Sequence, residues 1–86
     1  MEESQAVMEM IKIIAKWDPF QYGEEFYETE AVDVVQAVYD KDRADELAEA
    51  IQDIFEASFE QKLPIASCLQ AAEKLLLIKE SSSCTP

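Results

Sequence analysis

Apolar residues recur every three to four positions along most of this chain, the spacing that forms one face of an α-helix. Four segments carry the pattern, at about residues 4–17, 28–40, 42–61 and 64–80. Residues 1–80 are expected to form a single helical domain, and the unpatterned residues 81–86 a disordered tail. Short connections favour antiparallel neighbours, so we predict an all-α fold: a compact four-helix antiparallel bundle-like domain.

The first segment ends at a signal for helix termination. Asp18 and Pro19 follow Trp17 directly, and proline cannot continue a helix and disfavours helical geometry at the residue before it. The only glycine, Gly23, is expected in the connection that follows. The predicted inner face of this helix consists of Val7, Met10, Ile11, Ile14 and Trp17.

The second segment allows two interpretations, because valine favours strands. Its polar residues, however, recur at three and four positions rather than at two, which favours a helix. The predicted apolar stripe consists of Ala31, Val34, Val35 and Val38.

The third segment combines a core face with an acidic stripe that lies nearly opposite. Asp42 is its predicted N-cap, and Asp45 resembles the partner residue of a capping box. The residues at core spacing are Leu47, Ile51, Ile54, Phe55 and Ser58. The acidic stripe lies within about 80° of one helix side and consists of Asp42, Glu46, Glu49, Asp53, Glu56 and Glu60.

No lysine or arginine occurs between residues 44 and 61 to neutralise this stripe. Like charges three or four residues apart each cost a helix about 0.2–0.5 kcal/mol. The stripe is either a face for a basic partner or a surface that only increases solubility, and both interpretations stay open.

The fourth segment is expected to begin with Pro64 at its first helical position. Leu77 and Ile78 fall outside its apolar face, and together they could form a contact between two copies of the chain. The predicted inner face consists of Ile65, Cys68, Leu69, Ala72, Leu75 and Leu76.

The net charge of −12 is concentrated in the middle of the chain. Residues 18–60 carry fourteen acids against Lys41 and Arg43. Phosphate contacts need cations, so this balance disfavours nucleic-acid binding and favours a basic protein or a divalent cation. The chain begins with the acidic sequence MEE rather than a signal peptide, and its longest apolar run is residues 75–78, so we expect a cytoplasmic protein without membrane contact.

Most catalytic and metal sites need residue types that this chain lacks. It has no histidine, and Cys68 falls on an apolar stripe, where packing is its expected role. Asp40 and Asp42 match the first and third positions of an EF-hand, but Asp45 replaces the required glycine and Ile51 the bidentate glutamate. We therefore predict that the protein is not an enzyme and has no cofactor or metal site.

Residues 17–27, WDPFQYGEEFY, hold five of the eight aromatic residues together with several acids. Tyrosine and tryptophan often anchor interfaces, so this segment could be a recognition surface. Equally, its rings could cap one end of the bundle and fill a thin core. The candidate partner-binding residues here are Glu24, Glu25, Tyr27, Glu28 and Glu30.

Two short motifs carry a family resemblance. Trp17-Asp18-Pro19 after an amphipathic helix, and a Tyr-x-x-Glu element at Tyr27 and Glu30, resemble the YugE-like family of small acidic bacterial proteins of unknown function. The resemblance covers roughly residues 4–80 and implies a helical fold but no known activity. Phe26 departs from the family pattern, which favours an acidic residue there, and this argues against a polar site.

A looser similarity, in size, acidity and helical content, is to nuclease immunity proteins, which cover a basic active site with an acidic face. Their paired tyrosines are absent here, so the similarity is one of composition only.

The sequence as a whole predicts a non-enzymatic protein-protein interaction module that presents an acidic helix face to a basic partner, as a monomer or weak homodimer. One alternative is a carboxylate-based metal-binding protein or small enzyme. The other is a stand-alone homodimer, built on Leu77 and Ile78, without a partner for the acidic face.

Overall fold

The computed structural model describes residues 2–83, with side chains described for residues 5–23 and 25–81. Over these residues the chain forms α1 (Glu2–Trp17), the short 3-10 helix η1 (Glu24–Tyr27), α2 (Glu28–Asp40), α3 (Ala44–Phe59) and α4 (Ile65–Ser83). The predicted all-α fold with four main helices is confirmed.

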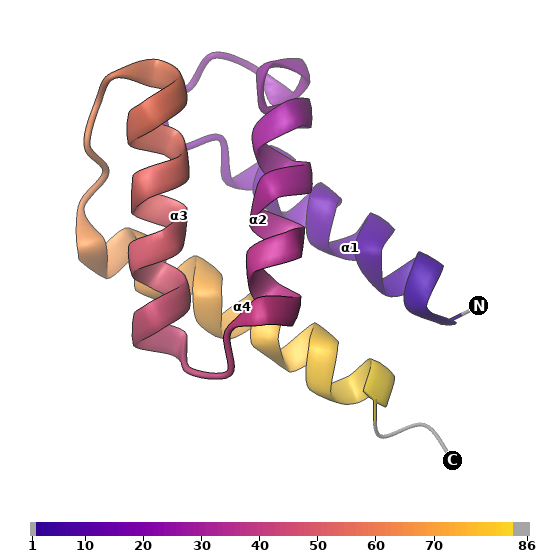
Figure 1. Cartoon of the computed structure of the whole chain (residues 1–86). Helices are drawn as coiled ribbons and strands as arrows, with labels where there is room; N and C mark the ends of the chain where they lie inside the picture. Colours follow the sequence, from indigo (N-terminus) through magenta and orange to yellow (C-terminus); the bar gives the residue numbers. More distant parts are fainter. Residues whose placement is uncertain (1, 84–86) are drawn as a thin grey trace.

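The four long helices form two layers (Figure 1). α2 and α3 stand side by side in the foreground, and α1 and α4 cross behind them. Each layer packs against the other, with α3 against α4 and α1 against α2. The start of α1 and the end of α4 lie on the same side of the molecule.

The core lies between these layers and is built largely from the predicted apolar stripes. The helical interpretation of the second segment is confirmed, and its whole valine stripe is buried in α2. Burying one large apolar side chain stabilises a fold by roughly 1.5–3 kcal/mol, which outweighs the lower helix propensity of valine. The fully buried large side chains include Met10, Ile14, Tyr27, Val34, Val38, Leu47, Ile51, Phe55, Cys68 and Leu75.

The inner face of α4 differs from the prediction. Ile65 and Leu69 are exposed, by 48% and 36%, and Ala71 is buried in their place. α4 packs against both α1 and α3, and the small side chains of Ala71 and Ala72 let two helices approach it closely. The helix also begins one residue later than predicted, because Pro64 lies before it and its carbonyl accepts from the N–H of Ser67 (3.1 Å).

The predicted start of α3 is also wrong. Arg43 is the N-cap residue, without a side-chain cap, and the helix begins at Ala44. Asp45 instead accepts two hydrogen bonds from Arg43, both 3.1 Å, and one from the Glu46 N–H at 2.9 Å. Asp42 contacts α4 instead of capping α3. A local pairing thus replaces the predicted capping box.

α4 continues three residues past its predicted end. Residues 81–83, assigned to the disordered tail, are helical. Residues 84–86 of that tail lie outside the described residues.

Lys79 of α4 holds the C-terminal end of α2. Its Nζ donates to the carbonyls of Val38 (3.0 Å) and Lys41 (3.3 Å) and to the Asp42 carboxylate (3.3 Å). The ammonium also lies 5.9 Å from the ring centre of Tyr39. α2 has no basic residue in its last turn, so α4 supplies the cation that the negative end of the helix dipole favours.

The connection between α1 and η1 is held by two side chains, Asp18 and Tyr27. The Tyr27 hydroxyl donates to Asp18 Oδ1 at 2.5 Å and accepts from the Phe20 N–H at 3.1 Å. Asp18 Oδ1 also accepts from the Gly23 N–H at 3.2 Å. Asp18 and Tyr27 therefore bond to each other and satisfy two backbone N–H groups of the loop.

This loop has an unusual backbone. Asp18, Gln21 and Gly23 have positive φ angles of 43°, 59° and 109°, and such angles are unfavourable for most residues. Gly23 combines its φ with a ψ of 153°, a conformation that is essentially restricted to glycine. The hydrogen bonds of Asp18 and Tyr27 compensate for this strain and fix the path of the loop.

Seven of the eight aromatic rings form one cluster at this end of the bundle. Phe55 is at its centre, with ring centroids 5.7 Å from Trp17, 5.9 Å from Tyr27 and 5.9 Å from Phe59. The interpretation that the aromatic segment caps the bundle therefore holds for its buried rings. The cluster consists of Trp17, Phe20, Tyr22, Phe26, Tyr27, Phe55 and Phe59.

We predict that Tyr27→Phe lowers the free energy of unfolding by about 1–3 kcal/mol, because the Phe20 N–H loses its partner while the ring is retained. Urea denaturation followed by circular dichroism measures the change. Tyr39→Phe, which alters an exposed tyrosine outside the cluster, is the matched control and should change stability little. Equal stability of Tyr27→Phe and the native protein would contradict this role.

The bond to Asp18 should also appear in the pH dependence of stability. Donation by the Tyr27 hydroxyl holds the pKa of Asp18 below its usual value of 3.8. A lowered folded-state pKa stabilises the fold above the unfolded value and loses that effect as the pH falls through the folded value. The stability difference between the native protein and Asp18→Asn should thus be constant near neutral pH and shrink below about pH 4.

Asparagine suits this test because it tolerates positive φ and can still accept hydrogen bonds. The measurement is a set of urea denaturation curves from pH 3 to 8. A stability difference that stays constant down to the lowest pH would show that the charge of Asp18 does not stabilise the fold.

Lys79→Met should lower the free energy of unfolding by about 1 kcal/mol, since it keeps the apolar stem but removes the cation from the end of α2. Lys62→Met, at an exposed loop lysine, is the control and should have a smaller effect. Thermal denaturation of both variants measures the two losses of stability. Equal losses would contradict the role assigned to Lys79.

Candidate interaction surface

Four predicted stripe residues lie together on the exposed side of α3. Glu46, Glu49, Asp53 and Glu56 are all exposed, whereas Leu47, Ile51 and Phe55 of the same helix are fully buried. Among the described side chains, no lysine or arginine forms an ion pair with any of the four. Arg43 attracts Glu46 electrostatically without an ion pair, so most of the negative charge on this side of α3 faces solvent without compensation.

The two ends of the predicted stripe do not belong to this surface. Asp42 precedes α3 and pairs with Lys79 across to α4. Glu60 follows α3 in a left-handed conformation (φ 57°, ψ 30°), and its N–H donates to the Glu56 carbonyl at 2.8 Å. The prediction placed both residues on the stripe by assuming a continuous helix, but the backbone is not helical at either position. The acidic stripe, as the structure defines it, is Glu46, Glu49, Asp53 and Glu56.

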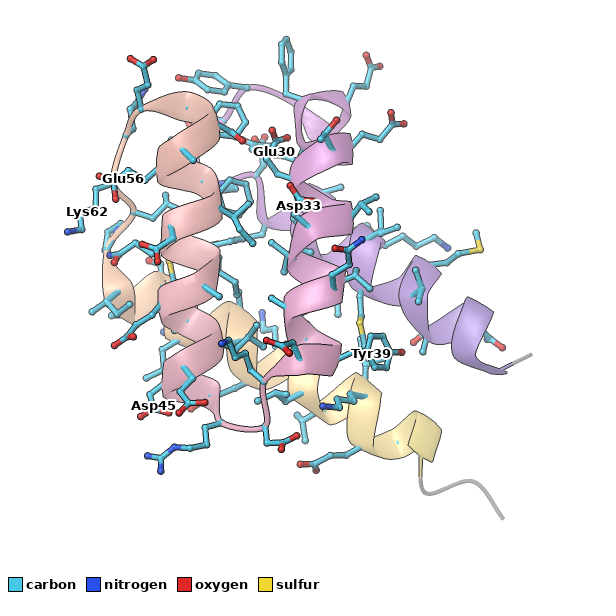
Figure 2. The ribbon with its side chains drawn as sticks, viewed as in Figure 1. Glu30, Asp33, Tyr39, Asp45, Glu56 and Lys62 are labelled. Atoms are coloured by element: carbon cyan, nitrogen blue, oxygen red, sulfur yellow. The ribbon has the colours of Figure 1, made fainter. Side chains whose placement is uncertain are left out.

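α2 adds acids to the same layer. Figure 2 shows Glu30 and Asp33 on the side of α2 next to α3, and Glu56 on the side of α3 turned away from α2. Glu28 is exposed at the start of α2, Glu25 is exposed in η1, and the side chain of Glu24 lies outside the described residues. The predicted candidates from residues 24–30 thus come from two elements, η1 and the start of α2, the helix beside α3.

Tyr27 is not available to a partner in this structure. Its side chain is fully buried, and burial together with the bond to Asp18 raises its pKa above the usual value. The exposed rings are instead Phe26, which is 63% exposed, and Tyr22, which is 43% exposed. Neighbouring residues in a 3-10 helix such as η1 point about 120° apart, so burying Tyr27 turns Phe26 outward.

The two exposed rings adjoin the C-terminal end of α3. Tyr22 lies 6.0 Å from Phe26 and 5.6 Å from Phe59, the last residue of α3, between ring centroids. The Gln61 side chain donates to the Tyr22 hydroxyl at 2.9 Å and ties the loop after α3 to this site. Phe26 and Tyr22 were not among the predicted site residues, because the sequence places aromatic residues in this segment without showing which of them are exposed. We call Tyr22 and Phe26 the aromatic pair.

The two predicted self-association residues, Leu77 and Ile78, differ in their exposure. Leu77 is 64% exposed, but Ile78 is only partly exposed and packs against the core. A single exposed leucine does not define an interface.

The remaining titratable groups indicate structural roles. Burial raises the pKa of the Cys68 thiol to about 11, so the unreactive thiol form dominates at neutral pH. The hydrogen bonds from Arg43 lower the pKa of Asp45. Within residues 5–23 and 25–81, no three acids or cysteines are placed to hold a metal ion.

Among the described residues, no helix is both long and apolar enough to cross a bilayer.

These features define a class: a small four-helix protein with an acidic face on one layer and an aromatic pair at the end of that face. A family model described as a domain of unknown function, DUF1871, matches residues 9–85. The chain belongs to the DUF1871 family, and the predicted YugE-like resemblance is confirmed.

Two relatives support this assignment. The chain is 77% identical to the uncharacterized protein YugE of Bacillus subtilis (strain 168) over 86 residues, the full length of both proteins. It is also similar to the crystal structure of APC36109 from Bacillus stearothermophilus, with 38% identity and a TM-score of 0.88 over 91% of this chain and 96% of that one. The family has no established function.

Proposed function

We propose that this protein is a non-enzymatic interaction module whose acidic stripe on α3 binds a basic surface of another protein. The supporting observation is the combination of four exposed, unpaired acids with a partly exposed aromatic pair at one end of the same helix. Complementary charge would raise the association rate and select the partner. Phe26 would supply the desolvated contact that charge alone does not give.

The arrangement on α3 favours this reading over a purely solubilising role. Repulsion between neighbouring stripe residues costs about 0.2–0.5 kcal/mol per pair, and alternating lysines would remove this cost. Solubility requires net charge but not its alignment on one helix. A basic partner would neutralise these charges on binding. Relief of the repulsion would then contribute favourably to the free energy of binding.

The proposal predicts that reversing three stripe charges, Glu49→Lys, Asp53→Lys and Glu56→Lys, abolishes partner binding without unfolding the protein. Thermal stability should stay equal or rise, because like-charge repulsion is relieved. The measurement is a pull-down from native host lysate at low and moderate salt, with the captured proteins quantified by mass spectrometry. Binding to the native protein should weaken with salt.

The matched control reverses three exposed acids on α1 and α4, Glu9→Lys, Glu73→Lys and Glu80→Lys. It changes the net charge by the same amount but leaves the acidic stripe intact. The control should retain most of the partner. Equal loss in both variants would mean that only net charge matters, and unchanged binding in the stripe variant would refute the proposal.

The aromatic pair can be tested in the same assay. Phe26→Ser should weaken capture without changing the fold, because Phe26 is mostly exposed. Exposed aromatic anchors contribute about 2 kcal/mol or more to many interfaces. Full binding by this variant would remove the aromatic pair from the proposed surface and leave the acidic stripe alone.

A further inference from the structure

A groove between α1 and α4 has a composition opposite to that of the acidic stripe. Its volume is about 300 Å³, and its walls include Lys16 and Trp17 from the end of α1 and Ser67, Gln70 and Lys74 from α4. It lies between helices of the second layer, whereas the acidic stripe lies on α3. A ligand in this groove would therefore not contact the acidic stripe.

Two lysines and no acids line this groove, in a chain with a net charge of −12. Within the described part of the chain, neither Lys16 nor Lys74 forms an ion pair with a carboxylate. Unpaired ammonium groups on both walls of one groove produce a local positive potential. The acids next to groove residues in the sequence, Asp18 and Glu73, do not line it, and ions in solution screen charges that lie beyond about 8–10 Å.

The other lining groups define what kind of anion would fit. The Ser67 hydroxyl and the Gln70 amide can both donate hydrogen bonds, while Trp17 and Ile13 supply apolar surface. Trp17 is half-buried, and its ring packs edge-on against Phe55, so one part of the indole is held firmly. A flat apolar ligand could pack on the remaining exposed part.

We propose that this groove binds a small organic carboxylate that carries a flat apolar body. Its volume is at the lower end for ligand sites, which suits a small molecule. The carboxylate would lie between Lys16 and Lys74, and the apolar body would lie against Trp17. The overall negative charge of the protein disfavours polyanions such as nucleotides more than a single carboxylate.

Lys16 has a second role that the test must separate from ligand binding. It lies in the last turn of α1, where a cation offsets the negative end of the helix dipole. Lys74 lies within α4 and has no such role. Variants at the two positions therefore distinguish an effect on the groove from an effect on α1.

The single tryptophan of the chain provides a direct readout, because Trp17 lines the groove. Phenylacetate is titrated into the full-length protein while Trp17 fluorescence and the NMR signal of its indole N–H are followed. A saturable change in both is expected, with a Kd below about 10 mM. The neutral analogue 2-phenylethanol and inorganic phosphate should each bind about tenfold more weakly, because each lacks one of the two recognition elements.

The double variant Lys16→Gln, Lys74→Gln should weaken phenylacetate binding about tenfold, and Lys74→Gln alone about threefold, as expected for partly exposed charges. The matched control Lys12→Gln, Lys62→Gln removes two lysines outside the groove and should change the Kd less than about twofold. Thermal denaturation of each variant checks that it is folded.

The proposal would be overturned by the absence of a saturable change at Trp17, by equal binding of phenylacetate and 2-phenylethanol, or by equal weakening in the groove and control variants. Phosphate that binds as well as phenylacetate would also overturn it, since the apolar body would then have no role. If Lys16→Gln unfolds α1, Lys74→Gln alone decides the outcome.

Discussion

The hydroxyl group of Tyr27 joins the polar loop of this protein to its aromatic core. It donates to Asp18 and accepts from the Phe20 N–H, while its ring is fully buried beside Phe55. The loop between α1 and η1 contains three positive φ angles and needs such anchors to keep one path. That path brings η1 to the start of α2 and closes the aromatic end of the bundle. It also turns Phe26 outward, beside the end of α3.

The acidic stripe is compatible with folding because the opposite side of α3 is strongly apolar. Repulsion among the four stripe residues amounts to about 1 kcal/mol over their neighbouring pairs. Burial of Leu47, Ile51 and Phe55 on the other side contributes several times more, at roughly 1.5–3 kcal/mol for each side chain. The fold thus tolerates a charged surface that a free helix would disfavour, which leaves this surface available for a binding role.

The apolar spacing predicted the four main helices well, because periodic burial determines which sides of α1, α2 and α3 face the core. On α3, however, Ser58 at core spacing is exposed and Ala48 is buried instead. The spacing could not predict the rotation of α4, where Ala71 is buried and Ile65 exposed, because that depends on how closely two other helices approach. Helix ends were also missed. Asp42 bonds to Lys79, which is distant in sequence, and no local pattern reveals such a pairing.

The candidate site shows the same division between local and tertiary information. The exposed acids of α3 follow directly from helical geometry, and only Asp42 and Glu60, where the backbone leaves the helix, fall outside that geometry. The choice between Phe26 and Tyr27 as the exposed ring could not be made from the sequence, because it depends on the contact of Tyr27 with Asp18. The groove between α1 and α4 joins residues fifty or more positions apart, so it appears only in the folded chain.

If the acidic stripe and the aromatic pair form one binding face, a bound partner must cover both. Hydrogen–deuterium exchange of the protein alone and with its captured, purified partner measures this coverage. The partner should slow exchange in α3 and around residues 22–26, and leave the backbone of α1 unchanged. Protection confined to α1 and α4, with none in α3, would contradict this binding face.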